Sequence, residues 1–142
     1  MNEASTGDQF QSWLAHMDDA IEAFVTSAPE PLRQQLDGTP ASLDKLEAWL
    51  LTRYAGVADS RPPSEAAFIG GAALYLGEIL RVATGSKWTI ENRDKKFVYF
   101  GLPILHGGRL GQMPACPMTM VTASLDRRTG RYLSTILANF ST

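Results

Sequence analysis

Residues 68–90 read FIGGAALYLGEILRVATGSKWTI, and this stretch decides the fold. Its first part predicts an almost entirely apolar helix, which carries one acid, Glu78, in its middle and ends at Gly85. A strand is expected directly afterwards, around Trp88. A helix that is apolar on nearly all sides is typically the central one, so we expect it to pack on the sheet that follows. A carboxylate in such surroundings needs partners, and Glu78 is therefore the residue whose placement most requires an explanation.

Three helices are expected before that strand, at about residues 8–28, 42–55 and 64–83. The first has a capping-box pattern at Asp8 and Gln11, and residues 1–7 ahead of it are expected to form a disordered tail. Ala28-Pro29-Glu30-Pro31 ends this helix, because proline disfavours helix in the residue before it.

After the central helix, two antiparallel strands are predicted at Lys87–Glu91 and Lys96–Leu102, joined by the polar turn 92–95. The patterns in residues 117–140 favour a pair of helices. The alternative is a β-hairpin around the polar turn Asp126–Gly130, since the flanking segments are rich in Thr, Val and Ile. The prediction is a single α+β domain spanning residues 1–142: three N-terminal helices, a short antiparallel β-sheet and a C-terminal helical pair.

The composition bounds the classes of protein. A chain of 142 residues with 44% hydrophobic and 20% charged residues is ordinary for one globular domain. One cysteine cannot form an internal disulfide, and the N-terminus lacks the pattern of a signal peptide. No apolar run appears long enough for a membrane span. We therefore expect a cytoplasmic protein that contacts no membrane, and the pI of about 5.6 argues against nucleic-acid binding.

The charge is divided unevenly along the chain. Residues 1–86 contain 12 Asp and Glu against 5 Lys and Arg, whereas residues 87–142 contain 3 against 8. Such a division can steer a charged partner, although each half can also simply solvate its own surface. The candidate interaction surfaces are an acidic set in the first helix and a basic set near the C-terminus: Asp18, Asp19, Glu22, Arg127, Arg128 and Arg131.

Few residues have the spacing of a catalytic or metal site. Glu78 can form an i, i+3 ion pair with Arg81, and it is either a structural anchor, which we favour, or an acid–base group with a raised pKa. Cys116 and His106 flank a glycine-rich loop but have no evident third group to orient them. The two histidines and one cysteine are too far apart in sequence to suggest a metal site, and no cofactor is expected.

A short signature does resemble that of a known group of proteins. Tyr75-Leu76-Gly77-Glu78-Ile79-Leu80-Arg81, followed by Gly85 and Trp88, resembles a Y-x-G-E-x-x-R…G-x-x-W pattern of small bacterial α+β proteins. The segments TPASLDKLEAWLL (39–51) and CPMTMVTASLDRRTGRYL (116–133) extend the resemblance. Some proteins with this pattern are similar to immunity or accessory proteins of bacterial toxin systems. The resemblance implies no catalytic residues, and it makes Tyr75, Gly77, Glu78, Arg81 and Trp88 signature positions with a structural role.

These observations together favour a non-enzymatic, cytoplasmic module that binds a protein partner, such as a toxin or a component of its own operon. One alternative is a small-ligand-binding protein or enzyme with Glu78 at the base of a pocket, surrounded by Tyr75, Arg81, Tyr99 or His106. Another is a structural homo-oligomer, for example a homodimer.

Overall fold

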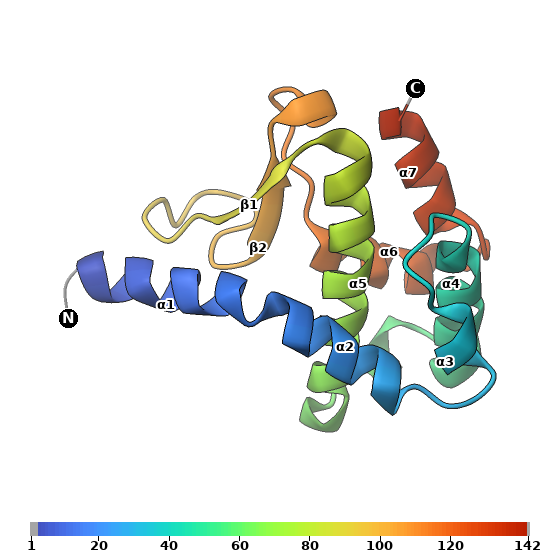
Figure 1. Ribbon diagram of the computed structural model, residues 1–142. Coiled ribbons are helices and arrows are strands. Elements are labelled where there is room, and N and C mark those ends of the chain that lie inside the picture. The colour runs from blue at the N-terminus through green and yellow to red at the C-terminus, as the bar shows by residue number, and fades with distance from the viewer. Residues whose placement is uncertain (1–2, 142) are drawn as a thin grey trace.

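The computed structural model describes residues 3–141, in which helices dominate and two short strands pair (Figure 1). The α-helices of this part of the chain are α1 (Glu3–Ala15), α2 (Met17–Ser27), α3 (Leu32–Gln35), α4 (Ser42–Arg53), α5 (Ala66–Thr84), α6 (Pro117–Arg127) and α7 (Tyr132–Ser141). The strands are β1 (Lys87–Ile90) and β2 (Pro103–His106), and single 3-10 turns lie at Val57–Ser60, Pro63–Glu65 and Gly108–Leu110. The fold is α+β, as predicted.

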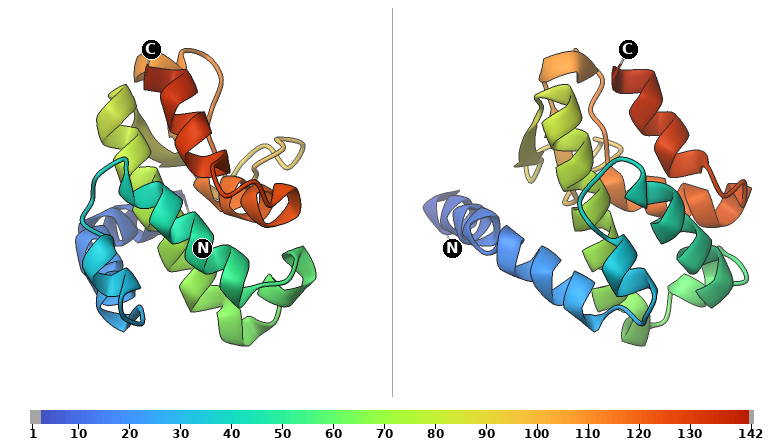
Figure 2. Two further views of the ribbon diagram at one scale, coloured as in Figure 1. Left: turned by 90° about the vertical axis from the view of Figure 1, so that its right-hand side faces the viewer. Right: turned by 45° about the vertical axis from the view of Figure 1, so that its right-hand side comes forward.

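Helix α5 is the centre of the molecule. It packs against α2, α6 and α7, and both views of Figure 2 place it between the α1–α2 pair and the α6–α7 pair. Ten of its residues are buried, which explains why the sequence is apolar on nearly every side. The helix ends at Gly85, whose φ of 71° is the left-handed conformation that glycine adopts without strain.

The segment Pro63–Thr84 is also long and apolar enough to cross a membrane: it has 22 residues, and an 18-residue window within it has a mean hydropathy of 1.4. The expectation that no segment approaches such a length was therefore wrong by this criterion. In the structure this helix packs against α2, α6 and α7, and 44% of the apolar window is buried within the protein.

The predicted first helix is two helices. Helix α1 ends at Ala15 and α2 begins at Met17. At His16, between them, the backbone N–H is shared between the carbonyls of Ser12 (3.1 Å) and Trp13 (3.3 Å), and the ring Nδ1 lies 2.7 Å from the Ser12 oxygen. The helix also begins earlier than predicted: residues 3–7 belong to α1, so the expected tail is wrong for these residues, and residues 1–2 lie outside the described part. Figure 1 shows α1 extending away from the body of the molecule.

The second strand was predicted at Lys96–Leu102 but lies at Pro103–His106 in the structure. Strand β1 pairs with β2 in an antiparallel register that puts Trp88 opposite Leu105, so residues 96–102 form turns rather than a strand. The reason lies in two carboxylates. Glu91 accepts hydrogen bonds from the backbone N–H groups of Arg93 and Asp94, and Asp94 accepts one from Lys96, which draws the chain into successive turns.

The C-terminal segment forms the helices α6 and α7, and the described residues contain no hairpin there. Pro117 stands at the first turn of α6, where its missing N–H is harmless. The start of α7 is stabilised by a residue far away in sequence. The buried carboxylate of Glu47 in α4 accepts hydrogen bonds from the backbone N–H groups of Tyr132 (3.1 Å) and Leu133 (2.8 Å).

Candidate functional site

The signature residue Glu78 is held by partners on two elements. Its Oε1 accepts hydrogen bonds from Arg81 Nε (3.0 Å) and Nη2 (2.6 Å), and its Oε2 accepts one from the indole Nε1 of Trp88 (3.1 Å). Burial by itself would raise the pKa of the Glu78 carboxyl, but the hydrogen bonds from Arg81 and Trp88 outweigh it and hold the pKa below its ordinary value. Glu78 is therefore ionised at neutral pH, which is the opposite of the raised pKa that an acid–base role would need.

The signature residue Gly77 and Trp13 from α1 hold the Trp88 indole in place. The indole lies directly over Gly77, where a Cβ atom would overlap it, so only glycine permits this approach. Trp13 from α1 packs against the same indole in a T-shaped arrangement, with ring centroids 5.4 Å apart. Gly77, Glu78, Arg81 and Trp88 thus form one cluster, which joins α5 to β1.

Tyr75 lies apart from that cluster. Its hydroxyl accepts the backbone N–H of Gly38 (2.9 Å) and lies 2.6 Å from the hydroxyl of Ser42. Because the Ser42 hydroxyl already donates to the carbonyl of Thr39, Tyr75 is the donor in this pair. Tyr75 therefore fixes the loop before α4 and does not face a cavity with Glu78.

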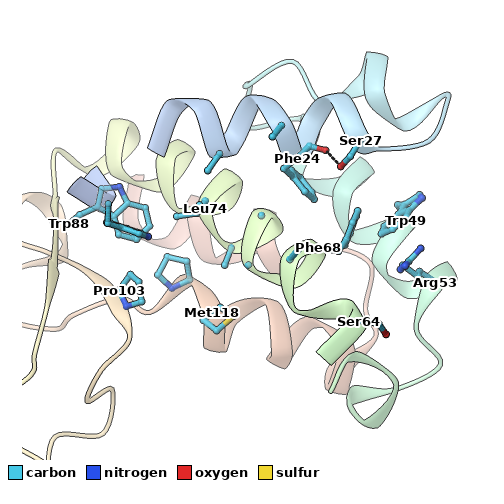
Figure 3. Close-up of a pocket in the computed structure, with 18 of the residues that line it drawn as sticks. Phe24, Ser27, Trp49, Arg53, Ser64, Phe68, Leu74, Trp88, Pro103 and Met118 are labelled. Atoms are coloured by element: carbon cyan, nitrogen blue, oxygen red, sulfur yellow. Dashed lines mark hydrogen bonds between the residues drawn. The ribbon is translucent and has the colours of Figure 1, made fainter. Parts of the chain in front are cut away.

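A large apolar groove lies elsewhere in the described structure. It has a volume of about 780 Å³ and runs along the first half of α5, between α2 and the start of α6 (Figure 3). Its aromatic residues come from five different elements: Trp13, Phe24, Trp49, Phe68 and Trp88. Its small residues lie along α2 and α5: Ala20, Ala23, Ala67, Gly70 and Gly71. Glu78 is not among the lining residues, so the geometry does not place it at the base of this groove.

The floor of the groove contains two adjacent glycines with different surroundings. A Cβ atom on Gly71 would lie 2.5 Å from Phe24 Cδ1, so internal packing explains that glycine. A Cβ atom on Gly70 would meet nothing within 4 Å. A glycine inside a helix costs about 1 kcal/mol relative to alanine. Nothing inside the described protein accounts for that cost at Gly70, where the side chain would point into the open groove.

One end of the groove carries its only charged lining residue, Arg53. The guanidinium lies over the rings of Trp49 and Phe68, with its Cζ atom 5.3 Å and 5.2 Å from the two ring centroids. Its Nε donates to Glu65 Oε1 at 2.7 Å, and the hydroxyl of Tyr54 donates to the same oxygen at 2.6 Å. Burial and the hydrogen bond to Glu65 raise the pKa of Tyr54 to about 12, while the hydrogen bonds from Arg53 and Tyr54 lower the pKa of Glu65. Arg53 is thus fixed in place at the mouth of the groove.

The acidic candidates Asp18, Asp19 and Glu22 are exposed on α2, which also contributes the groove residues Ala20 and Ala23. The hydrogen bond to Glu78 is the main cause of the raised pKa of Arg81, and the charge of Asp18 adds a smaller contribution. The acidic set therefore adjoins the groove through a shared helix without forming part of its lining.

The basic candidates have separate surroundings near the end of α6. Arg128 adopts a left-handed conformation with a φ of 55°, and its guanidinium donates to the carbonyls of Tyr54 (3.0 Å) and Leu51 (2.8 Å) at the end of α4. Arg127 lies over the ring of Tyr132, and Arg131 is exposed. At least Arg128 therefore serves the fold rather than offering a free charge.

The residues of the glycine-rich loop do not assemble a nucleophilic site. The backbone of Leu105 pairs with that of Ala115. The next residue, Cys116, is buried, and its thiol faces the carbonyl of Pro103 at the start of β2. His106 is exposed at the opposite end of that strand. The described residues contain no group of three or more His, Cys, Asp or Glu that could hold a metal ion.

Sequence reasoning missed the groove and most of its lining. The sequence singles out neither Arg53 nor Phe68, and it indicates packing roles for Trp13, Trp49 and Trp88. It also predicts that Gly70, like Gly71 and Gly77, lies where the helix packs closely against a neighbour. The structure shows such close contacts at Gly71 and Gly77 but not at Gly70. A signal was present in α5: Ala67, Gly70, Gly71 and Leu74 follow the i, i+3, i+4, i+7 spacing of one helical face. A face made of such small residues allows another molecule to come close to the helix backbone.

No protein-family model, curated protein or solved structure was found to match this chain.

Proposed function

We propose that this chain is a non-enzymatic binding module and that it takes an apolar segment of a protein partner in the groove along α5. The observation that carries the proposal is Gly70. This glycine destabilises its own helix, and the space that a side chain would occupy is open groove. Such a glycine is expected where another molecule must approach the helix backbone.

The shape of the groove supports a peptide segment as its occupant. The stretch from Ala67 to Leu74 covers about 10 Å of helix, which is two helical turns, and the groove continues to Trp88 beyond it. Ala20, Ala23 and Ala67 are exposed, so the walls are low and a backbone can come close. Helix-in-groove recognition uses such apolar surfaces with aromatic side chains at the contact.

The polar lining supports binding rather than chemistry. Among the groove's lining residues the polar side chains are Ser27, Arg53 and Ser64. The Ser27 hydroxyl donates to the carbonyl of Phe24, and Arg53 pairs with Glu65. A nucleophile with an adjacent base is the usual requirement of covalent catalysis, and these groups do not supply it. The partner that the sequence resemblance implies is a protein of a bacterial toxin system. A cytoplasmic location of this chain is consistent with such a partner.

The experiment is site-specific photo-cross-linking in the native cells. A benzophenone amino acid replaces Ala67 on the groove wall, and a second protein carries it at Ala138, which is exposed on α7. The proposal expects one discrete adduct from position 67, identified by mass spectrometry as another protein and absent from position 138. The variant Gly70→Leu, which fills the groove, should abolish that adduct, and Ala138→Leu should leave it unchanged.

Three results would contradict the proposal. An adduct with a second copy of this chain would indicate the homodimer instead. Equal adducts from positions 67 and 138, or an adduct that survives Gly70→Leu, would mean that the groove does not select the partner.

A further inference from the structure

We propose, on the basis of the binding function above, that the groove recognises the C-terminus of its partner: an apolar tail lies along α5 and its free carboxylate binds Arg53. The volume of the groove does not indicate the chemistry of the bound segment, whereas the position of Arg53 at one end of the groove does.

The geometry of Arg53 carries this proposal. Its guanidinium is held from one side by Glu65, through Nε, and from its face by the rings of Trp49 and Phe68. Such a side chain has already lost its rotational freedom before a ligand arrives, so little further entropy is lost on binding.

The remaining donors of Arg53 are unused in the described structure. Its hydrogen bonds, to Glu65 and to the hydroxyl of Tyr54, both leave from Nε. The Nη1 and Nη2 groups have no partner among the described residues, and 42% of the side chain is exposed. The two terminal nitrogens of a guanidinium present parallel N–H groups that match the two oxygens of a carboxylate.

The charges favour a carboxylate over a more highly charged group. Glu65 already neutralises much of the Arg53 charge, and its side chain is only 17% exposed, so it stays in place. A doubly charged phosphate would meet repulsion from this carboxylate, whereas a single negative charge would meet less. Ser64, which also lines this end of the groove, forms a side-chain hydrogen bond with Glu65 and helps to hold that carboxylate in place.

The apolar lining favours a terminal carboxylate over an acidic side chain. From Arg53 the groove leads along Phe68 and Leu74 to Trp88; none of these side chains is charged, and the indole N–H of Trp88 is already bonded to Glu78. A peptide C-terminus carries its negative charge at one end, and the residues before it can all be apolar. The groove has the matching arrangement, with one positive charge at one end and an apolar lining along the rest.

The test uses two phage-display libraries of short random peptides. One exposes a free C-terminal carboxylate, and the other carries the same random residues followed by a Gly-Ser tail. Peptides are selected on the wild-type protein, and those that still bind Gly70→Leu are discarded. We expect apolar peptides from the first library only.

Synthetic versions of the selected peptides then test the role of Arg53. Amidation of the C-terminus is expected to weaken binding by roughly ten- to a hundredfold, the effect of losing a hydrogen-bonded charge pair at a partly exposed site. Arg53→Gln should cause a similar loss for the free acid and little additional loss for the amide. Arg61→Gln, which changes an exposed arginine outside the groove lining, is the matched control and should have no effect.

The outcomes separate this inference from the proposed function. If acid and amide bind equally and both are lost in Gly70→Leu, the carboxylate inference is wrong and the groove remains the binding site. If neither library yields a peptide that depends on Gly70, both proposals are wrong. If neither yields a binder but dodecanoate binds with the same dependence on Arg53 and Gly70, the carboxylate belongs to a fatty acid and the peptide tail is overturned.

Discussion

Glu47 in α4 and Leu133 in α7 are 86 residues apart, yet the buried carboxylate of the first accepts the backbone N–H of the second at 2.8 Å. The same carboxylate also accepts the N–H of Tyr132. The first N–H groups of a helix have no partner within it, and here a side chain from another helix supplies one. Glu47 therefore does the work of an N-cap residue across the tertiary structure and ties the C-terminal helix to α4.

Replacing Glu47 by alanine should lower the free energy of unfolding by about 3 kcal/mol, because two buried N–H groups lose their acceptor and a cavity is left. Urea unfolding followed by circular dichroism measures this change. Asp44→Ala is the control, since Asp44 is only half-buried and bonds the hydroxyl of Ser134, and its loss should be below about 1 kcal/mol. Equal losses in the two variants would mean that the cap contributes little.

The adjacent glycines of α5 should respond in opposite directions. Gly70→Ala is expected to raise the free energy of unfolding by about 1 kcal/mol, since the new methyl group meets nothing and alanine favours helix. Gly71→Ala should lower it by about 2 kcal/mol, because the methyl group overlaps the ring of Phe24. Thermal melts of the two variants beside the wild type test the pair. A stabilised Gly71→Ala would show that Phe24 moves easily, and the account of the groove floor would fail.

The pH dependence of stability should reveal the Glu78 cluster. The pKa of Glu78 in the folded protein lies below its ordinary value of 4.5, so the folded state binds this proton less readily than the unfolded state. The resulting stabilisation is fully present above the unfolded pKa and is lost as the pH falls through the folded pKa. Wild type should therefore be more stable than Glu78→Gln near pH 7, and the difference should shrink toward about pH 3. A difference that stays constant over this range would argue against an ionised Glu78.

The packing contact between the Trp88 indole and Gly77 can be tested with a double-mutant cycle. Trp88→Ala should cost about 3–5 kcal/mol, because a nearly buried indole is removed. Gly77→Ala should also destabilise, since its methyl group overlaps that indole. In the double variant the indole is absent and the methyl group has space, so the total loss should be smaller than the sum of the two. Strict additivity would mean that the two residues do not share this contact.

The sequence was a good guide where the signal was local. The apolar run of α5, its end at Gly85 and the Glu78–Arg81 ion pair follow from spacing along one helix, and the structure contains all three. Prediction failed where side chains redirected the backbone. The alternating residues 96–102 have the composition of a strand, but Glu91 and Asp94 bind the backbone N–H groups just before them. His16 similarly divides what the apolar periodicity presents as one helix.

Taken by itself, then, the sequence determined the class of fold and the identity of the central helix, because both depend on the hydrophobic pattern within single segments. The groove was decided by tertiary structure alone. Its aromatic residues belong to five elements, and their separation in sequence contains no sign that they meet. Gly70 and Gly71 are the plainest case: they are the same residue at neighbouring positions, and only the presence of Phe24 over one and open space over the other gives them different roles.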